Sequence, residues 1–579
     1  MILICLASLR RPLLYFAVLL GAGWIASSFP GGECADFAGF AAQAHAQPAS
    51  SVRIPAESFS SANVDAILAA GGALEREGRW GEALSHFESA ARKHPGVAEF
   101  EHRATLARIH YDVGHRYADS SFLSDLRTLT SNDSVKTYEE VLSKIDGYFV
   151  KPPSWSDLAL RGVMNMEIAL TEPAFVQRHL AGVEPARIEA FRREIGRLTD
   201  YREVNSQQAA RNAAVLVANE GYRRLGLTPT ATMLEFVAGA VGGLDHYSSF
   251  LTAAQLDDLY CQIEGNFVGM GVELKADAGS LLIVNALAGS PAEQAGIRSG
   301  DRIVAVEGRT TQEISTDRAA DILKGEEGTW VNVTVRSPGG AVRDLRVQRR
   351  RVEVPSVENV RIADEGFGVG YLRIGSFQKT TPRDMEAALW RLHRQGMRSL
   401  IIDVRGNPGG LLTASVEVAD KFLKEGMIVS TRGRSPQEDF DYRAHQVGTW
   451  RPPLIVLIDG NTASAAEIFA GAIADHRRGT VLGERSYGKG SVQGIFPLAN
   501  QRHGVRLTTA KFYSPSGRAI SDRGVLPDMQ VTQTLKPQAG SSGAVYGGSA
   551  ATTANAQPDD DPVLTAALQL ARRRLAERN

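Results

Sequence analysis

The stretch LIVLIDGNTASAAEIFAGAIADHRRG, residues 454–479, sets the character of the C-terminal half of this 579-residue chain. Its first five residues are apolar and predict a strand. The polar turn DGNT follows, and the run rich in Ala and Ile after it predicts a helix. A strand that leads directly into a helix is typical of an α/β layered domain, where the loops leaving strand ends are the expected place for chemistry.

The same alternation extends around this stretch. Two further apolar runs, GVGYLRIGSF and SLIIDVRG, are each followed by a helical pattern. We therefore predict an α/β core over residues 353–535. Residues 536–579 begin with a Gly/Ser/Ala-rich and then acidic stretch, which favours a flexible linker, and end with a helix near residues 563–576.

Between residues 267 and 350 the pattern changes to short strands with two short helices. Ser290-Pro291 predicts the start of the first helix and Gly296 its end, while DRAADILKG predicts the second. TWVNVTVRS and VRDLRVQ predict a hairpin across a Pro-Gly-Gly turn. This order resembles a PDZ domain, which we assign to residues 261–352.

The entrance to this region reads FVGMGVEL and predicts a binding site for a peptide C-terminus. It contains Gly269, Met270, Gly271 and Val272, where PDZ domains have their glycine-apolar-glycine-apolar loop. The glycines allow successive N–H groups to point at one spot, which suits a terminal carboxylate. An adjacent edge strand is expected to accept an extended peptide.

Two helical blocks precede the PDZ-like region, at residues 60–180 and 181–260. Within the first, ALEREGRWGEALSHFESAARKHPG is similar to one tetratricopeptide repeat. The similarity depends on Gly78, Trp80, Ala83, Phe87, Ala90 and Pro95. A lone repeat cannot bury both faces, so either degenerate repeats flank it or it is an ordinary helical hairpin docked on a neighbour. A protein partner through this hairpin is one of the expected interactions.

The N-terminus, residues 1–46, predicts an export signal. Arg10 and Arg11 precede about fifteen largely apolar residues, a run short for a bilayer span. Because the small-residue site Ala44-His45-Ala46 comes late, an uncleaved membrane anchor is the alternative. We expect an exported protein of the periplasm or cell envelope.

Composition excludes several classes of partner and cofactor. Lys plus Arg number 64 and Asp plus Glu 65, a net charge of -1, so no global basic field favours nucleic acid. Cys5 and Cys34 fall in the leader, which leaves Cys261 as the one cysteine after it. A single thiol builds neither an intramolecular disulfide nor a zinc cluster, and we expect no metal or cofactor.

Ser464 is a candidate nucleophile in the turn before the predicted helix. The N–H of Ala465 belongs to the unpaired donors of the first helical turn, where the helix dipole favours negative charge, so an oxyanion formed by attack of Ser464 is stabilised there. The alternative is that Thr462 or Ser464 is merely an N-cap residue. In the loop RGNPGG, Gly410 is the candidate second oxyanion donor and Gly409 the alternate; a plain helix-entry turn is the other interpretation.

The stretch GERSYGKGSVQ, residues 483–493, supplies the candidate base. Its spacing fits a phosphate-binding loop, but Gly490 follows the lysine where such loops have Ser or Thr, and a predicted strand follows instead of a helix. A lysine desolvated among glycines is a competent base for serine, so we assign Lys489, with Gln493 as its orienting amide. The core histidines do not lie in loops that look like strand-end sites: His393, His445, His476 and His503.

In combination these motifs resemble the C-terminal processing peptidases, also called tail-specific proteases. The similarity spans about residues 235–530 and includes LDHYSSFLT, the PDZ-like region, RGNPGG, NTASAAEI, SYGKGSVQ and TTAKFYSPSGRAI. It implies a crotonase-like α/β core with an inserted PDZ domain, and it makes residues 181–260 the helical part of the peptidase's own N-terminal region. It also implies Ser464 as nucleophile, Lys489 as base, Gln493 as orienter, and Gly410 with Ala465 as oxyanion donors.

Two features depart from the family pattern. His246 stands where the family has proline in LDPYS, and the N-terminal helical region is unusually long. The function implied is an exported, metal-free serine endopeptidase that captures free C-termini of proteins or peptides in its PDZ domain. The alternative is a catalytically vestigial scaffold that only binds peptides.

Overall fold

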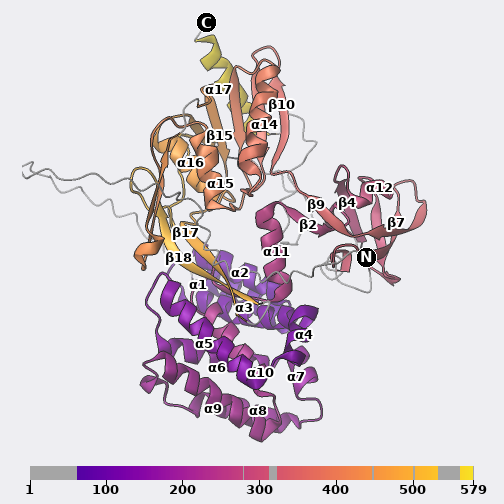
Figure 1. Ribbon diagram of the computed structural model, residues 1–579, viewed down its shortest axis with the longest axis vertical. Coiled ribbons are helices and arrows are strands. Elements are labelled where there is room, and N and C mark those ends of the chain that lie inside the picture. The colour runs from indigo at the N-terminus through magenta and orange to yellow at the C-terminus, as the bar shows by residue number, and fades with distance from the viewer. Residues whose placement is uncertain are drawn as a thin grey trace, which may run out of the picture.

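The computed structural model describes residues 61–277, 280–311, 322–445, 449–499, 503–532 and 561–577. The expected leader, residues 1–46, and the expected linker, residues 538–560, lie outside the described residues. Figure 1 shows a block of helices, a sheet-and-helix unit above it, and a β-rich lobe to one side. In the described ranges no helix combines the length and apolar character needed to cross a membrane.

The sheet-and-helix unit is built on a six-stranded mixed sheet. Its strands, in spatial order, are β10 (Val357–Asp364), β11 (Val369–Ile374), β12 (Ser399–Asp403), β15 (Leu454–Ile458), β16 (Thr480–Gly483) and β19 (Met529–Gln530). The neighbours from β11 to β19 pair in parallel, and β10 pairs antiparallel with β11 at one edge. The predicted α/β layered core is therefore present.

Helices cover both faces of this sheet. On one face lie α14 (Thr381–Arg394), α15 (Leu412–Asp420) and α16 (Ala465–Asp475), packed on residues such as Leu400 and Val456. The other face, with Ile401 and Ile455, is covered by α17 (Pro562–Ala576). Successive strand residues point to opposite faces, which is why runs such as LIVLI are apolar throughout.

An ion pair fixes the start of α17 to the core. The guanidinium of Arg405, just after β12, donates to both carboxylate oxygens of Asp561 at 3.0 and 2.8 Å. Asp561 is also the N-cap of α17, because its side chain accepts from the Val563 and Leu564 N–H groups. The last described helix is thus tied to the first residue of RGNPGG.

A second sheet joins the core to the helical block. It contains β1 (Ser249–Leu251), β13 (Gly426–Gly433), β14 (Phe440–Ala444), β17 (Ser491–Pro497) and β18 (Gly504–Tyr513). Phe496 and Val505, from β17 and β18, belong to the same buried cluster as Tyr138 and Phe236 of the helices. The helical block and the β17–β18 hairpin therefore share one core.

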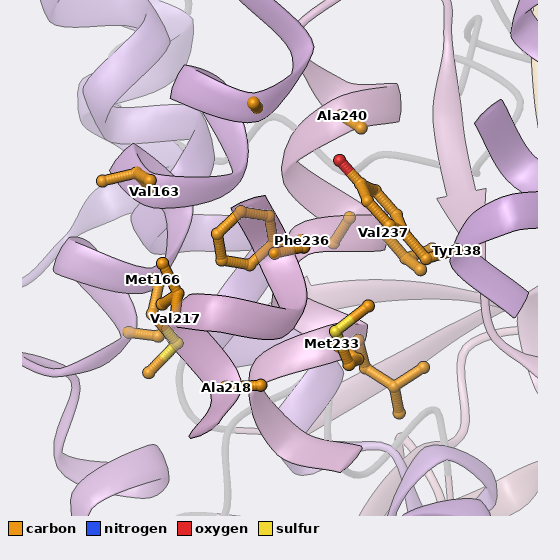
Figure 2. Packing of buried hydrophobic residues seen from close by; sticks show 14 of the residues in the cluster. Tyr138, Val163, Met166, Val217, Ala218, Met233, Phe236, Val237 and Ala240 are labelled. Atoms are coloured by element: carbon orange, nitrogen blue, oxygen red, sulfur yellow. The ribbon is translucent and has the colours of Figure 1, made fainter. Parts of the chain in front are cut away.

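The helical block contains ten helices between residues 61 and 242, followed by α11. They are α1 (Ser61–Arg76), α2 (Trp80–Lys93), α3 (Ala98–Ala118), α4 (Ser120–Thr128), α5 (Ser131–Tyr148), α6 (Trp155–Ala169), α7 (Pro173–His179), α8 (Pro185–Glu194), α9 (Gln207–Leu225), α10 (Pro229–Gly242) and α11 (Ala253–Glu264). Figure 2 shows α10 at the centre, with Phe236 between Val163 and Tyr138. A Cβ atom on Gly162 would lie 2.3 Å from the Phe236 ring, so glycine permits this close approach.

The tetratricopeptide-like stretch covers the end of α1 and all of α2. Ala83, Phe87 and Ala90 of α2 form a small core of their own with Phe100 and Ala104 of α3. This cluster is separate from the large core of the other helices. The α2–α3 hairpin, residues 80–118, thus has a small core of its own, while the last turns of α3, with Val113 and Tyr117, pack into the large core.

The lateral lobe has the strand order predicted for a PDZ-like region. Its elements are β2 (Asn266–Gly269), β3 (Val272–Asp277), β4 (Ser280–Ala286), α12 (Pro291–Gln294), β5 (Arg302–Val306), β6 (Arg309–Thr310), β7 (Trp330–Arg336), β8 (Val342–Gln348) and β9 (Arg350–Glu353). Ser290 caps α12, and β7 pairs with β8 as the predicted hairpin. The predicted helix at 317–325 lies largely outside the described residues.

Candidate active site

Ser464 lies on a strained turn between β15 and α16. Its backbone has φ 54° and ψ −119°, a conformation that non-glycine residues seldom adopt and that costs about 1–3 kcal/mol. Two hydrogen bonds hold it there: the Ser464 N–H donates to Glu467 Oε2 at 2.8 Å, and the Glu467 N–H donates to the Ser464 carbonyl at 2.8 Å. Thr462, the other candidate N-cap, donates its hydroxyl to the Val404 carbonyl instead.

The glycines of RGNPGG lie against this turn. A Cβ atom on Gly409 would lie 2.7 Å from Ser464 Cβ and 3.0 Å from the Ala465 nitrogen. The Gly409 N–H donates to Asn407 Oδ1 at 2.8 Å and is therefore occupied. In the described part of the chain, the hydrogen bonds leave the N–H groups of Gly410 and Ala465 without a protein acceptor. Of the two glycines, Gly410 is thus the better oxyanion donor.

Lys489 lies in a segment without helix or strand, residues 484–490, that connects β16 to β17. Its N–H donates to Glu467 Oε2 at 2.8 Å, the same oxygen that accepts from Ser464. The other oxygen of Glu467 accepts from the Gly488 N–H at 2.7 Å and from the Ser486 hydroxyl at 2.5 Å. One fully buried carboxylate therefore ties the Lys489 segment to the Ser464 turn.

Sequence reasoning missed Glu467. The signal was available, because Ser464 and Glu467 form an S-x-x-E pattern, in which the glutamate reaches back to the N-cap N–H. Burial raises the pKa of the Glu467 carboxyl, and the hydrogen bonds from Ser486, Gly488, Ser464 and Lys489 act in the opposite direction. Both candidate catalytic segments donate hydrogen bonds to this carboxylate, which fixes them relative to each other.

The Lys489 ammonium is enclosed by groups from distant parts of the chain. Its Nζ lies 4.9 Å from the centroid of the Tyr247 ring, which belongs to the LDHYSSFLT motif. Burial, and then the Arg506 charge, lower the pKa of Lys489 from 10.5 to about 8, against the Glu467 and Asp245 charges, which raise it. With that pKa, about a tenth of the amine is neutral at pH 7, which is enough for a general base.

The other candidate bases have partners elsewhere. His476, the C-cap of α16, bonds through Nε2 to the Met427 carbonyl at 2.6 Å, and His503 lies 3.0 Å from Asp125. His445 lies 2.9 Å from Asp420, and His393 is next to the rings of Trp390 and Trp450. These contacts favour Lys489 as the base.

Gln493 is not joined to Lys489 by any hydrogen bond recorded among the described residues. Its amide Nε2 donates to the Ser491 hydroxyl at 2.9 Å and to the Ser491 carbonyl at 3.1 Å. The pairing of β17 with β18 is irregular between Val492 and Gln493. Such an irregularity changes the direction of a side chain from the one it has in a regular strand. The orienting role of Gln493 stays a prediction.

The predicted carboxylate-binding loop connects β2 to β3. Gly271 has φ 83°, and a Cβ atom there would lie 2.3 Å from Ser290 Cβ, so only glycine fits. The Met270 side chain is buried in the lobe, and no backbone hydrogen bond between described residues uses the N–H of Met270 or Gly271. The strand that starts at Val272, β3, lies at the edge of its sheet, and Gly269 ends β2.

Known proteins match both the β-rich lobe and the core. The model of peptidase family S41 matches residues 368–531, and that of the PDZ domain matches residues 282–337. The carboxy-terminal-processing protease of Bartonella bacilliformis is 37% identical over 306 residues, 52% of this chain and 69% of that protein. The carboxyl-terminal-processing protease of Synechocystis sp. is 34% identical over 293 residues, 50% of this chain and 68% of that protein.

A solved structure also matches. The photosystem II D1 C-terminal processing protease is 27% identical and is covered over 95% of its chain and 66% of this one, with a TM-score of 0.36.

The chain is therefore a multidomain serine peptidase with a helical N-terminal region, a PDZ domain and a peptidase core on mixed sheets. It belongs to the carboxy-terminal-processing proteases of peptidase family S41, as the resemblance of its motifs predicted.

Proposed function

We propose that this peptidase cleaves with a Ser464/Lys489 dyad and an oxyanion hole formed by Gly410 and Ala465. The observation that carries the proposal is the bridge made by Glu467, since one carboxylate oxygen accepts from the N–H groups of both Ser464 and Lys489. The lowered pKa of Lys489, about 8, supports the role of base. Gln493 is proposed to orient the amine when substrate is bound.

The reaction follows from these positions. The neutral Lys489 amine takes the Ser464 hydroxyl proton as Oγ bonds to the carbonyl carbon of the peptide. The carbonyl oxygen becomes an anion and accepts from the N–H groups of Gly410 and Ala465. The ammonium returns the proton to the leaving amine as the C–N bond breaks. A water molecule then bonds to the ester carbon and gives its proton to Lys489, which returns a proton to Ser464 Oγ as the ester C–O bond breaks.

We further propose that substrates are proteins with free, unstructured C-termini. The loop with Gly269, Met270, Gly271 and Val272 offers N–H groups to the terminal carboxylate, and β3 pairs with the residues before it. The finer assignments also belong here: the domain boundaries 60–180, 181–260, 261–352, 353–535 and 536–579, a crotonase-like core, and export to the periplasm or cell envelope, with the leader as signal or anchor.

The decisive experiment compares the wild-type chain with Ser464→Ala on a disordered polypeptide that has an apolar C-terminus, in EDTA and without nucleotide. We expect cleavage by the wild type only. If both proteins bound the polypeptide and neither cleaved it, the vestigial scaffold would be favoured instead.

Capture of C-termini is tested with a matched pair of substrates, one amidated at its C-terminus. Loss of the anionic acceptor is expected to weaken capture by about 1.5–3 kcal/mol, and kcat/KM for a long substrate falls accordingly. Equal rates for the two substrates would contradict capture by the PDZ domain and leave the dyad standing.

A further inference from the structure

The α2–α3 hairpin contacts the segment that carries Lys489. Arg92, in the last turn of α2, donates from Nη1 to the Tyr487 hydroxyl at 3.1 Å. Its guanidinium carbon also lies 5.7 Å from the centroid of the Tyr487 ring. Tyr487 is two residues before Lys489 and is 41% exposed even with this contact.

The same hairpin contacts a second segment that encloses Lys489. Arg108 of α3 donates from Nη1 to the His246 carbonyl at 3.3 Å. Its other nitrogen pairs with Glu88 of α2, and the two side chains are only 19% and 20% exposed, so the arginine is fixed in place. His246 precedes Tyr247, whose ring lies 4.9 Å from the Lys489 Nζ.

Neither segment has regular secondary structure to hold it. Residues 484–490 contain no helix or strand, and residues 243–248 form turns between α10 and β1. Loops of this kind take their positions from the groups packed against them. The hairpin itself lies outside the residues matched by the peptidase and PDZ family models.

We infer that the α2–α3 hairpin is a positioning element for the base: Arg92 and Arg108 hold the two segments, around Tyr487 and Tyr247, that enclose the Lys489 side chain. The inference rests on the proposed role of Lys489. Figure 1 shows α2 and α3 beneath the β17–β18 hairpin, which begins two residues after Lys489. Through these two arginines the α2–α3 hairpin supports the base and is not only a site for partners.

The consequence for Lys489 is electrostatic. The charged groups that face it are Arg506, Glu467 and Asp245, with Tyr247 as the aromatic wall. These remain when the hairpin contacts are lost, but water gains access to the amine. Because burial is the main cause of the lowered pKa, that pKa moves back toward 10.5 and less of the amine is neutral near pH 7.

The test is the pH dependence of kcat/KM for a short peptide, from pH 6 to 10, in the full chain. In Arg92→Ala/Arg108→Ala we expect the rising limb to move upward by about one pH unit, so activity near pH 7 falls about tenfold and recovers toward pH 10. When Arg108 is replaced by Lys instead of Ala, a donor for the His246 carbonyl is kept. We then expect the rising limb to move most of the way back to its wild-type position.

The control is Arg103→Ala, in the same helix. Arg103 pairs with Glu75 of α1, away from both segments, and this variant is expected to leave the limb unchanged. If the double variant melts below the assay temperature, Tyr487→Phe, which removes only the hydroxyl that accepts from Arg92, is measured instead and is expected to shift the limb in the same direction.

Two outcomes separate this inference from the proposed function. If the folded double variant keeps its limb unchanged, with or without a changed KM, the positioning role is overturned. The dyad still stands in that case, provided that Lys489→Met is inactive. A Lys489→Met protein that still cleaves overturns the dyad itself, and with it this inference.

Discussion

The two proposed catalytic segments of this peptidase are held in place in different ways. The Ser464 turn is fixed by its neighbours in sequence: a strand before it, a helix after it, and Glu467 three residues on. The Lys489 segment has no such frame, and its side chain is enclosed by Tyr247 and Arg506, with contacts that reach back to the helical hairpin. The proposed nucleophile is thus placed by local structure, and the proposed base by tertiary contacts.

The largest effect is expected at the dyad itself. Ser464→Ala and Lys489→Met should each lower kcat by a factor on the order of a thousand or more, and the double variant should be no worse than either, because the two groups act as a unit. Single-turnover assays on one peptide measure this. If Lys489→Met kept most of its activity, the tertiary contacts around that residue would be structural only.

The next effect tests the frame of the nucleophile. In Gly410→Ala the new Cβ would lie 2.1 Å from the Phe377 carbonyl oxygen, so the loop must move and its N–H leaves the oxyanion position. We expect kcat to fall about a hundredfold, with a lower Tm. Gly517→Ala is the control, since Gly517 has φ 77° but nothing within 4 Å of the added Cβ; its activity should be unchanged.

Glu467→Gln tests the joint between the two segments. The buried carboxylate accepts four hydrogen bonds, and an amide offers one oxygen and turns an NH₂ group toward the remaining N–H donors. We expect a loss of about 1–3 kcal/mol in unfolding free energy and about a tenfold fall in kcat/KM. Glu365→Gln, on an exposed turn, is the control. Lower stability with full activity would show that the bridge does not align the dyad.

The smallest effect is a pH-dependent difference in stability. Below pH 8 the folded chain must bury a charged Lys489, and between pH 8 and 10.5 it releases that proton before the unfolded chain does, so stability rises with pH in this window. Lys489→Met lacks the charge at every pH. Its Tm should exceed that of the wild type by a few degrees at pH 7, and the gap should narrow toward pH 10.5. A constant gap would contradict a lowered pKa.

The same contrast decides what the sequence could predict. Strands such as LIVLI and the helix after Ser464 follow from local patterns, and so does the position of Ser464 at a helix N-terminus. Lys489 was reached because its surrounding glycines suit a buried amine. Its contact with Tyr247 was not predictable, because no local pattern brings together residues separated by some 240 positions. Glu467 left a local signal that pointed to a helix cap and not to a bridge.

The ion pair between Arg405 and Asp561 has a consequence for the order of events during synthesis. When β19 has been made, every residue of the dyad and of the oxyanion loop already exists. One face of the central sheet is still bare until α17 arrives, and Arg405 still lacks one of its two carboxylate partners. Until α17 has been synthesised, the packing around Arg405, the first residue of RGNPGG, therefore stays incomplete.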